Sequence, residues 1–253
     1  IATFTTDLCE AVAEEAAGAD SIAVAMNDVP EGYAYPDRVR FEVAQNSLNE
    51  YRNTADFLNV NQVQGTCVQH EYGIFGGRAG SHLLALLREL RMPIVTTLHT
   101  VLRDPNDDQR RVVEELARLS DRLVVMSQQA VEFLTDIHKI PRSKITMIHH
   151  GVPDVSFVDP SYYKDLFGVE GHRVILTFGL LSPNKGIEYM IYALPAVVRQ
   201  HPDVVYMVLG ATHPHVLRAQ GEEYRIILQR RAHERGVREN VIFQNRFVTL
   251  PEL

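Results

Sequence analysis

The chain has 253 residues, of which 45% are hydrophobic and 23% charged, as expected for a globular protein with one large or two small domains. Its formal net charge of −7 argues against a nucleic-acid-binding protein, which would usually show a basic domain. The only cysteines, Cys9 and Cys67, form no C-x-x-C pair, so we expect two reduced thiols in a cytoplasmic protein rather than a disulfide scaffold. We identify no apolar run of transmembrane length and no signal peptide, while peripheral membrane contact stays open.

Residues 1–150 form a predicted N-terminal domain in which helices and strands alternate. The first helix should be capped by Thr5 or Thr6 and should end at Gly18. Strands are then expected at residues 21–26, 39–43, 66–70, 94–98, 123–126 and 145–148, and helices at 46–58, 81–90, 106–119 and 127–137. This alternation predicts a doubly wound, Rossmann-like α/β domain. Because such a domain normally begins with a strand, we expect that residues are missing upstream of Ile1.

Residues 151–171 lack a clear hydrophobic period and contain several prolines and glycines, which predicts a linker with a short helix near residues 162–167. Residues 172–253 form a second predicted domain. Its strands are expected at 174–178, 204–209 and 241–243, and its helices between Gly186 and His201 and at 222–235. The first two strands are continuous apolar runs, which indicates that both of their faces are buried. These elements make an incomplete Rossmann-like half.

The loop between the first strand and the first helix of this second domain carries candidate chemistry. It runs from Gly179 to Gly186, at the carboxyl end of a strand and before a helix N-terminus, where free N–H groups favour anions. Lys185 adds a charge suited to phosphate, and Gly186 lets the backbone approach closely. Gly210, at the end of the next strand, would border the same ligand. The pattern is not a P-loop and lacks G-x-G-x-x-G, so an ordinary surface lysine is the alternative.

Three segments, in order along the chain, resemble motifs of the family 4 (group 1) glycosyltransferases, which are retaining enzymes of the GT-B fold. F-G-L-L-S-P-N-K-G-I-E, residues 178–188, is similar to the family's donor loop, which commonly reads G-R-(x)n-K-G. I-H-H-G-V-P-D, residues 148–154, resembles the N-G-V-D segment before the interdomain linker, and T-T-L-H-T, residues 96–100, resembles a strand end that often carries a histidine. Leu180 stands where the arginine usually sits. The family's E-x7-E segment has no counterpart, so the chain resembles a GT-B protein truncated at both ends.

The resemblance implies transfer of a sugar from a nucleoside-diphosphate sugar to a carbohydrate or small-molecule acceptor, with retention of anomeric configuration. The C-terminal half would bind the donor at Gly179, Lys185, Gly186 and Gly210, and Lys185 would stabilise charge on the departing diphosphate. His99 would contact the donor sugar or help to position the acceptor; a structural histidine is the alternative. No metal cofactor is implied, because protein cations and helix dipoles stabilise the leaving group in this fold.

The N-terminal domain would hold the acceptor near a second strand end. His70 and Glu71 end the strand predicted at 66–70, and short polar groups on fixed strand ends suit sugar recognition. Gly76 and Gly77 follow in a glycine-rich loop. We therefore predict acceptor contacts by these four residues. A solvated loop for the polar pair, and turn geometry for the glycine pair, are the alternatives.

Other groups of polar residues resemble functional motifs, but structural roles explain them better. The pairs His149–His150 and His213/His215 lack a third ligand at zinc-like spacing. The acidic run 104–108 sits before a helix, where Asn and Asp are ordinary caps. Ser127 could suggest a hydrolase triad with His99, but G-x-S-x-G is absent and a helix cap is the simpler interpretation.

Two further hypotheses stay open. A GT-B phosphorylase or epimerase would share the same phosphate chemistry. A non-catalytic nucleotide-sugar-binding protein is favoured by Leu180 in place of the arginine. The sequence does not define the donor base and sugar, the acceptor, or the oligomeric state.

Overall fold

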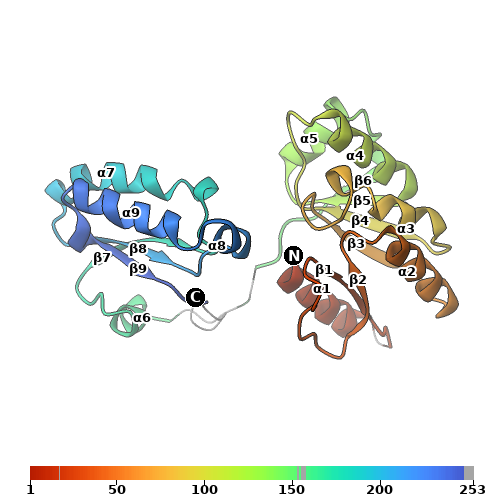
Figure 1. Cartoon of the computed structure of the whole chain (residues 1–253), viewed down its shortest axis with the longest axis horizontal. Coiled ribbons are helices and arrows are strands. Elements are labelled where there is room, and N and C mark those ends of the chain that lie inside the picture. The colour runs from red at the N-terminus through yellow and green to blue at the C-terminus, as the bar shows by residue number, and fades with distance from the viewer. Residues whose placement is uncertain (17, 153, 155–157, 248–253) are drawn as a thin grey trace. The chain divides into compact units, whose positions relative to one another are not determined.

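The computed structural model describes residues 1–16, 18–152, 154 and 158–247. The chain divides into two compact units, residues 1–153 and 154–253 (Figure 1). Both units are α/β with parallel strands, which confirms the predicted fold class. Of the predicted linker, residues 153 and 155–157 lie outside the described residues, as do residues 248–253 of the predicted second domain.

The described residues of unit 1 form six strands, all paired in parallel: β1 (Ala23–Asn27), β2 (Val39–Ala44), β3 (Thr66–His70), β4 (Ile94–Leu98), β5 (Arg122–Val125) and β6 (Ile145–Met147). They form two hydrogen-bonded sheets in the described residues, β1-β2 and β3-β4-β5-β6, where the sequence predicted one. The register of the larger sheet aligns the ends of β3 and β4, with His70 opposite Leu98. Residues that follow these two strands therefore emerge side by side.

Within the described part of unit 1, five α-helices accompany these strands: α1 (Ala2–Glu15), α2 (Leu48–Val60), α3 (Leu83–Glu89), α4 (Asp107–Leu119) and α5 (Gln128–Asp136). The start predicted for α1 is wrong. The hydroxyls of Thr5 and Thr6 donate to the carbonyl oxygens of Ile1 and Ala2 at 2.9 and 3.2 Å. These bonds run four residues back within the helix, so neither threonine is a cap.

Two predicted helix caps are confirmed. The Asn106 side chain accepts from the backbone of Gln109 at 2.9 Å, and the Gln109 side chain accepts from the backbone of Asn106 in return, which completes a capping box for α4. Ser127 Oγ accepts from the backbone N–H of Ala130 at the start of α5. The acidic run before α4 and the serine before α5 therefore have structural explanations.

In unit 2 the described residues form one parallel sheet in the order β7-β8-β9. Its strands are β7 (Arg173–Phe178), β8 (Val204–Leu209) and β9 (Val241–Gln244), and its helices are α6 (Pro160–Leu166), α7 (Ile187–Gln200), α8 (Pro214–Gln220) and α9 (Glu223–Glu234). Helices α7 and α9 pack on one face of the sheet and α6 lies on the other (Figure 1). No helix in the described part of the chain has the length and apolar character needed to cross a membrane.

Part of the predicted linker belongs to this unit. Val169, which follows α6, is buried against Val205 and Met207 of β8. Helix α8 was not predicted, because His213–Pro214 reads as a loop signal. Proline is nonetheless tolerated at the first helical position, where its missing N–H costs nothing.

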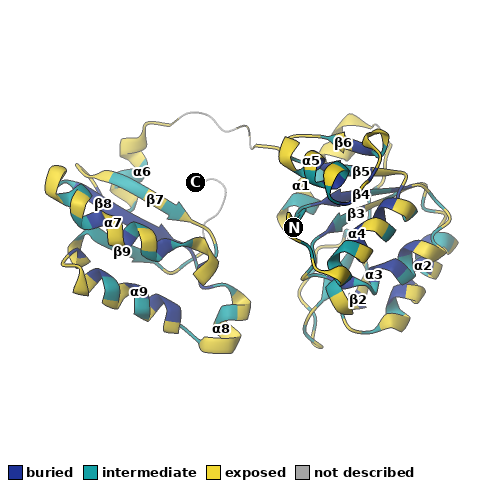
Figure 2. Ribbon diagram, turned by 90° about the horizontal axis from the view of Figure 1, so that it is seen from above, coloured by how far each residue is buried: buried dark blue, intermediate teal, exposed yellow. Residues whose placement is uncertain are grey.

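The two apolar strands of unit 2 differ in burial. All six residues of β8 are buried, as predicted (Figure 2). The prediction that β7 is buried on both faces is wrong, because Leu176 and Phe178 are 48% and 60% exposed. In the described sheet β7 is an edge strand. An apolar run has the same sequence signature at the edge of a sheet as at its centre.

Candidate functional site

The carboxyl ends of β3 and β4 bring together a hydrogen-bonded group of side chains. His99 Nε2 lies 2.9 Å from Gln69 Oε1, and the backbone N–H of His99 donates to the carbonyl oxygen of His70 at 3.0 Å. One carboxylate oxygen of Glu71 accepts from the Thr100 hydroxyl, and the other accepts from the backbone of Tyr72. Predicted residues His99 and Glu71 therefore share one sheet edge, and each is held in a defined orientation.

His99 sits in a partly apolar setting at this edge. The Phe4 ring of α1 meets it edge-on at 4.8 Å between ring centroids, and the same ring lies 5.4 Å from His150. Burial is the main cause that lowers the pKa of His99; Glu71 opposes the shift, and His150 adds a lowering that is smaller than the Glu71 effect. A neutral imidazole is therefore favoured near pH 7, and it can donate one hydrogen bond and accept another.

His70 lies in the core behind this edge. Its side chain is 0% exposed and packs between Tyr72 and Phe75, with ring centroids at 5.1 and 6.0 Å. Neither ring nitrogen has a hydrogen-bond partner among the described residues, and burial lowers its pKa to about 4. A fully buried ring offers no surface to an acceptor. The prediction that His70 contacts the acceptor directly is therefore corrected, and Glu71 is the partly exposed member of the pair.

Close packing around positions 76 and 77 leaves no room for a side chain. The Tyr51 hydroxyl donates to the carbonyl oxygen of Gln45 and accepts from the backbone N–H of Gly76, both at 2.9 Å. A Cβ on Gly76 would lie 2.0 Å from that carbonyl oxygen. Gly77 has φ +78°, and a Cβ there would lie 2.6 Å from the Ser81 hydroxyl. These contacts favour the turn-geometry alternative, and a role of either glycine toward an acceptor stays a prediction.

In unit 2, the loops after β7 and β8 continue the pairing of their strands. The backbone N–H of Leu181 donates to Ala211, and that of His213 donates back to Leu181, each at 2.9 Å. Gly179 and Gly210 face each other so closely that a Cβ on Gly210 would lie 2.0 Å from the Gly179 carbonyl oxygen. Two predicted site residues are thus brought together, and their lack of side chains is what permits this approach.

The loop then turns into the N-terminus of α7. Gly186 adopts the left-handed conformation with φ 65° and ψ 26° and directly precedes this 14-residue helix. Lys185 stands just before it, exposed, and no acidic partner is found for its ammonium in the described part of the chain. A cation thus lies next to the unpaired N–H groups of a helix start, and the combination suits a phosphate group. Leu180 supplies no second cation.

Sequence reasoning missed four residues behind this loop, which we call the Arg225 cluster: Thr212, Glu222, Arg225 and Asn245. They join the ends of β8 and β9 to the start of α9. Arg225 is 6% exposed, in a helix whose other arginines, Arg230 and Arg231, are more exposed. The available signal was Asn245 directly after a strand end, but nothing in the local pattern distinguishes a buried arginine from a surface one.

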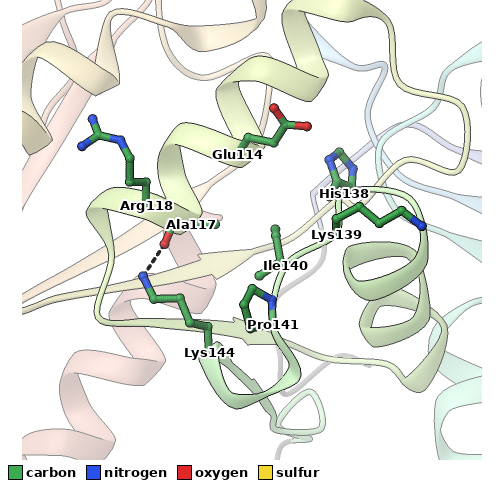
Figure 3. A pocket seen from close by; sticks show the side chains of 8 residues that line it. All are labelled: Glu114, Ala117, Arg118, His138, Lys139, Ile140, Pro141 and Lys144. Atoms are coloured by element: carbon green, nitrogen blue, oxygen red, sulfur yellow. Dashed lines mark hydrogen bonds between the residues drawn. The ribbon is translucent and has the colours of Figure 1, made fainter.

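Two hollows lie at the opposite, amino-terminal edges of the sheets. In unit 1, a hollow of about 290 Å³ lies between α4 and the segment before β6, and Figure 3 shows Lys144 reaching the Ala117 carbonyl at its rim. Lys144 Nζ also donates to the Ser120 carbonyl at 2.8 Å, so its charge caps the C-terminus of α4. In unit 2, a hollow of about 370 Å³ lies beside Arg173, which is bound to Asp203. Neither hollow includes a predicted site residue.

Local hydrogen bonds engage His213 of one histidine pair and His150 of the other. His213 Nδ1 accepts from the backbone of His215 at the start of α8, and the two rings stack at 5.4 Å. His150 Nδ1 lies 2.7 Å from the Gly151 carbonyl oxygen. Within the described ranges, no group of three or more His, Cys, Asp or Glu residues is arranged to hold a metal ion.

Two family models match the chain. Residues 1–156 match "Glycosyltransferase Family 4" and residues 163–252 match "Glycosyl transferases group 1". The D-inositol 3-phosphate glycosyltransferase of Corynebacterium glutamicum is 28% identical over 177 residues, which cover 62% of this chain and 41% of that protein. The chain therefore spans less than half of that relative's length.

Solved structures share the fold at low sequence identity. Sucrose-phosphate synthase from Thermosynechococcus elongatus matches with a TM-score of 0.72 and 15% identity, over 97% of this chain and 64% of that one. Anabaena Alr3699/HepE, solved in complex with UDP-glucose, matches with a TM-score of 0.65 and 17% identity, over 85% of this chain and 58% of that one.

Proposed function

Because the chain belongs to glycosyltransferase family 4, we propose that the protein transfers a sugar from a nucleoside-diphosphate sugar to a carbohydrate or small-molecule acceptor, with retention of anomeric configuration. In this proposal unit 2 binds the donor and unit 1 supplies groups that face the acceptor. The UDP-glucose complex of the Anabaena neighbour makes a uridine nucleotide the first donor to test.

One observation carries the proposal: the loop that ends β7 presents Lys185 and Gly186 at the start of α7. When the bond between the sugar and the diphosphate breaks, negative charge grows on the leaving diphosphate. An ammonium and helix N–H groups at this position would stabilise that charge more strongly in the transition state than in the bound donor. We propose that these protein groups do this without a metal ion. Because position 180 is a leucine, the positive charge of this loop comes from Lys185.

His99 and Glu71 have a supporting role in this proposal. Both lie at the carboxyl edge of β3 and β4, with their orientations fixed by Gln69 and Thr100. A neutral imidazole can hydrogen-bond a sugar hydroxyl. Glu71 is partly exposed, and its carboxylate can accept a hydrogen bond from a hydroxyl group of the molecule that receives the sugar.

The test has two measurements on the full-length protein. The first is titration calorimetry with UDP, and with UDP-glucose, against the wild type and Lys185→Ala. Lys164→Ala is the matched control, because this lysine of α6 borders the hollow at the opposite edge of the same unit. We expect UDP binding that weakens in Lys185→Ala alone. No binding of any nucleotide diphosphate would overturn the proposed donor site.

The second measurement is product analysis by mass spectrometry and NMR, with and without acceptors. A glycoside that keeps the anomeric configuration of the donor is expected. Turnover of the donor without an acceptor would favour the epimerase alternative, and sugar 1-phosphate formation would favour a phosphorylase. Binding without any turnover would support a nucleotide-sugar-binding protein, the alternative that Leu180 favours.

A further inference from the structure

The Arg225 cluster is a closed hydrogen-bond network at the carboxyl edge of unit 2. Arg225 Nε donates to Glu222 Oε2 at 3.0 Å. Arg225 Nη2 lies within 3.1 Å of three acceptors, which are the carbonyl oxygen of Gly210, the hydroxyl of Thr212 and the side-chain oxygen of Asn245. Thr212 donates in turn to Glu222 at 2.7 Å. One guanidinium therefore ties the ends of two strands to the first turn of α9.

Stability alone is a poor explanation for this arginine. It is 6% exposed, and Nη1 is buried without a partner among the described residues. Burying a guanidinium costs several kcal/mol, and well-packed apolar residues often stabilise a fold as well or better. An unpaired buried donor adds to the cost. What the arginine supplies, and an apolar side chain cannot, is a fixed geometry for several backbone and side-chain acceptors at once.

The partner carboxylate is held in its charged form. Glu222 is 36% exposed, and hydrogen bonds from Thr212 and then Arg225 keep its pKa below the usual range. Thr212 itself is 4% exposed. The ion pair is therefore maintained at neutral pH, and the hydroxyl of Thr212 bridges its two charges.

Arg225 bonds to residues 210 and 212, and this segment packs against residues 179–182 of the loop that leads to Lys185. Gly210 packs directly against Gly179, and Ala211 and His213 bond to Leu181 on both sides. Leu181 and Ser182 are 1% and 8% exposed, and the chain then passes straight into the turn that carries Lys185. A shift of residues 210–212 would therefore move residues 179–182 with it.

We propose that Arg225 is a positioning residue of the donor site: its guanidinium fixes residues 210–212, and these in turn fix the loop that presents Lys185 and the start of α7 to the diphosphate. The consequence for the donor rests on the proposed function, whereas the consequence for loop order does not. Arg225 itself makes no contact with the ligand in this scheme.

The test compares three variants with one matched control. Arg225→Lys keeps the charge but loses the forked geometry, and Thr212→Val keeps the shape but removes the bridging hydroxyl. Arg225→Met removes the charge. The control is Asn240→Ala, because Asn240 Nδ2 donates to the Val204 carbonyl at 2.9 Å and so joins β9 to β8 at the opposite edge of the same sheet. Melting temperatures show whether each variant folds.

Two readouts are taken on the full-length protein. Amide hydrogen exchange of residues 179–186 reports loop order without any ligand, and we expect at least about tenfold faster exchange in Arg225→Lys and Thr212→Val than in Asn240→Ala. UDP affinity, by calorimetry, should fall by about tenfold in the same two variants and by less than about twofold in the control.

The outcomes separate the two proposals. Loop exchange that is no faster in the cluster variants than in Asn240→Ala, at matched loss of melting temperature, would overturn the positioning role. If loop exchange is faster in the cluster variants but the wild-type protein binds no UDP, the positioning role stands and the proposed donor site is overturned. If Arg225→Met does not fold, the lysine and valine variants still decide the question.

Discussion

The carboxyl edges of the two units are built in different ways. In unit 1 the edge is made of side chains at and just after strand ends, with His99 bonded to Gln69 and Thr100 bonded to Glu71. In unit 2 the loops at the edge are shaped mainly by backbone, with two facing glycines, a left-handed Gly186 and a helix start, from which Lys185 projects, and the side chains of the Arg225 cluster lie behind them. A side-chain edge can adapt to many acceptors by substitution. A backbone edge suits a ligand part that does not vary, such as a diphosphate.

The largest effect should come from removing Lys185, the charged side chain that projects from the backbone edge. Lys185→Ala should reduce kcat by roughly a hundredfold or more, because a lost charge-assisted contact costs about 2–4 kcal/mol of transition-state stabilisation. Steady-state kinetics measure the effect, with Lys164→Ala as control. Unchanged kcat with an intact fold would mean that the diphosphate is stabilised elsewhere, and the contrast between the two edges would lose its functional meaning.

The second effect concerns the core behind the edge of unit 1. The pKa of His70 is lowered to about 4, so the folded state resists protonation more than the unfolded state does. The unfolding free energy of unit 1 should therefore be fully present above pH 6.5 and should fall by up to about 3 kcal/mol as the pH drops toward 4. Urea titrations at several pH values, followed by exchange of amides in β3 and β4, measure this.

His70→Leu should flatten that pH dependence, whereas His233→Gln, an exposed position in unit 2, should leave it unchanged. A steep loss of stability on acidification that survives in His70→Leu would show that groups other than this ring set the acid response, either carboxylates or His138, which is also buried in unit 1 with a pKa lowered by burial. The comparison with unit 2 is informative, because its edge contains no buried histidine among the described residues.

A third effect tests the backbone edge itself. Gly210→Ala should destabilise unit 2 by about 1–3 kcal/mol, because its φ of +150° disfavours a side chain and the new Cβ would collide with the Gly179 carbonyl oxygen. UDP binding should weaken together with stability. Thermal unfolding and calorimetry measure the two changes. Gly168→Ala is the control, because it also has positive φ but nothing within 4 Å of the added Cβ. Equal effects in both variants would show that strain, not the contact with Gly179, dominates.

The contrast between the edges also explains what the sequence could predict. Strand–helix alternation gave the α/β class, and the helix caps at Asn106 and Ser127 were found from local rules. His99, Glu71 and Lys185 were found because each directly follows or precedes a recognisable element end. Positions with local causes are visible in a linear pattern.

Features with non-local causes were not visible. His70 and Glu71 are neighbours at the same strand end, so the sequence pattern does not distinguish them. The burial of His70 between Tyr72 and Phe75 depends on how the loop after β3 folds back. The exposure of β7 depends on its edge position in the sheet. Arg225 lies in a charged helix, and its role depends on Thr212 and Asn245, which are 13 and 20 residues away.

The smallest expected effect comes from the amino-terminal edge of unit 1. Lys144→Met removes two hydrogen bonds to the last carbonyls of α4 and should cost only about 1 kcal/mol, because water in the adjoining hollow can replace the ammonium. Urea denaturation measures the loss, and Arg118→Met, which lines the same hollow but pairs with Glu115 in solvent, should change less. Transfer activity should be unaffected in both. A loss of activity in Lys144→Met at preserved stability would show that the two edges of the sheet are coupled, and the division of unit 1 into a functional edge and a structural edge would have to be abandoned.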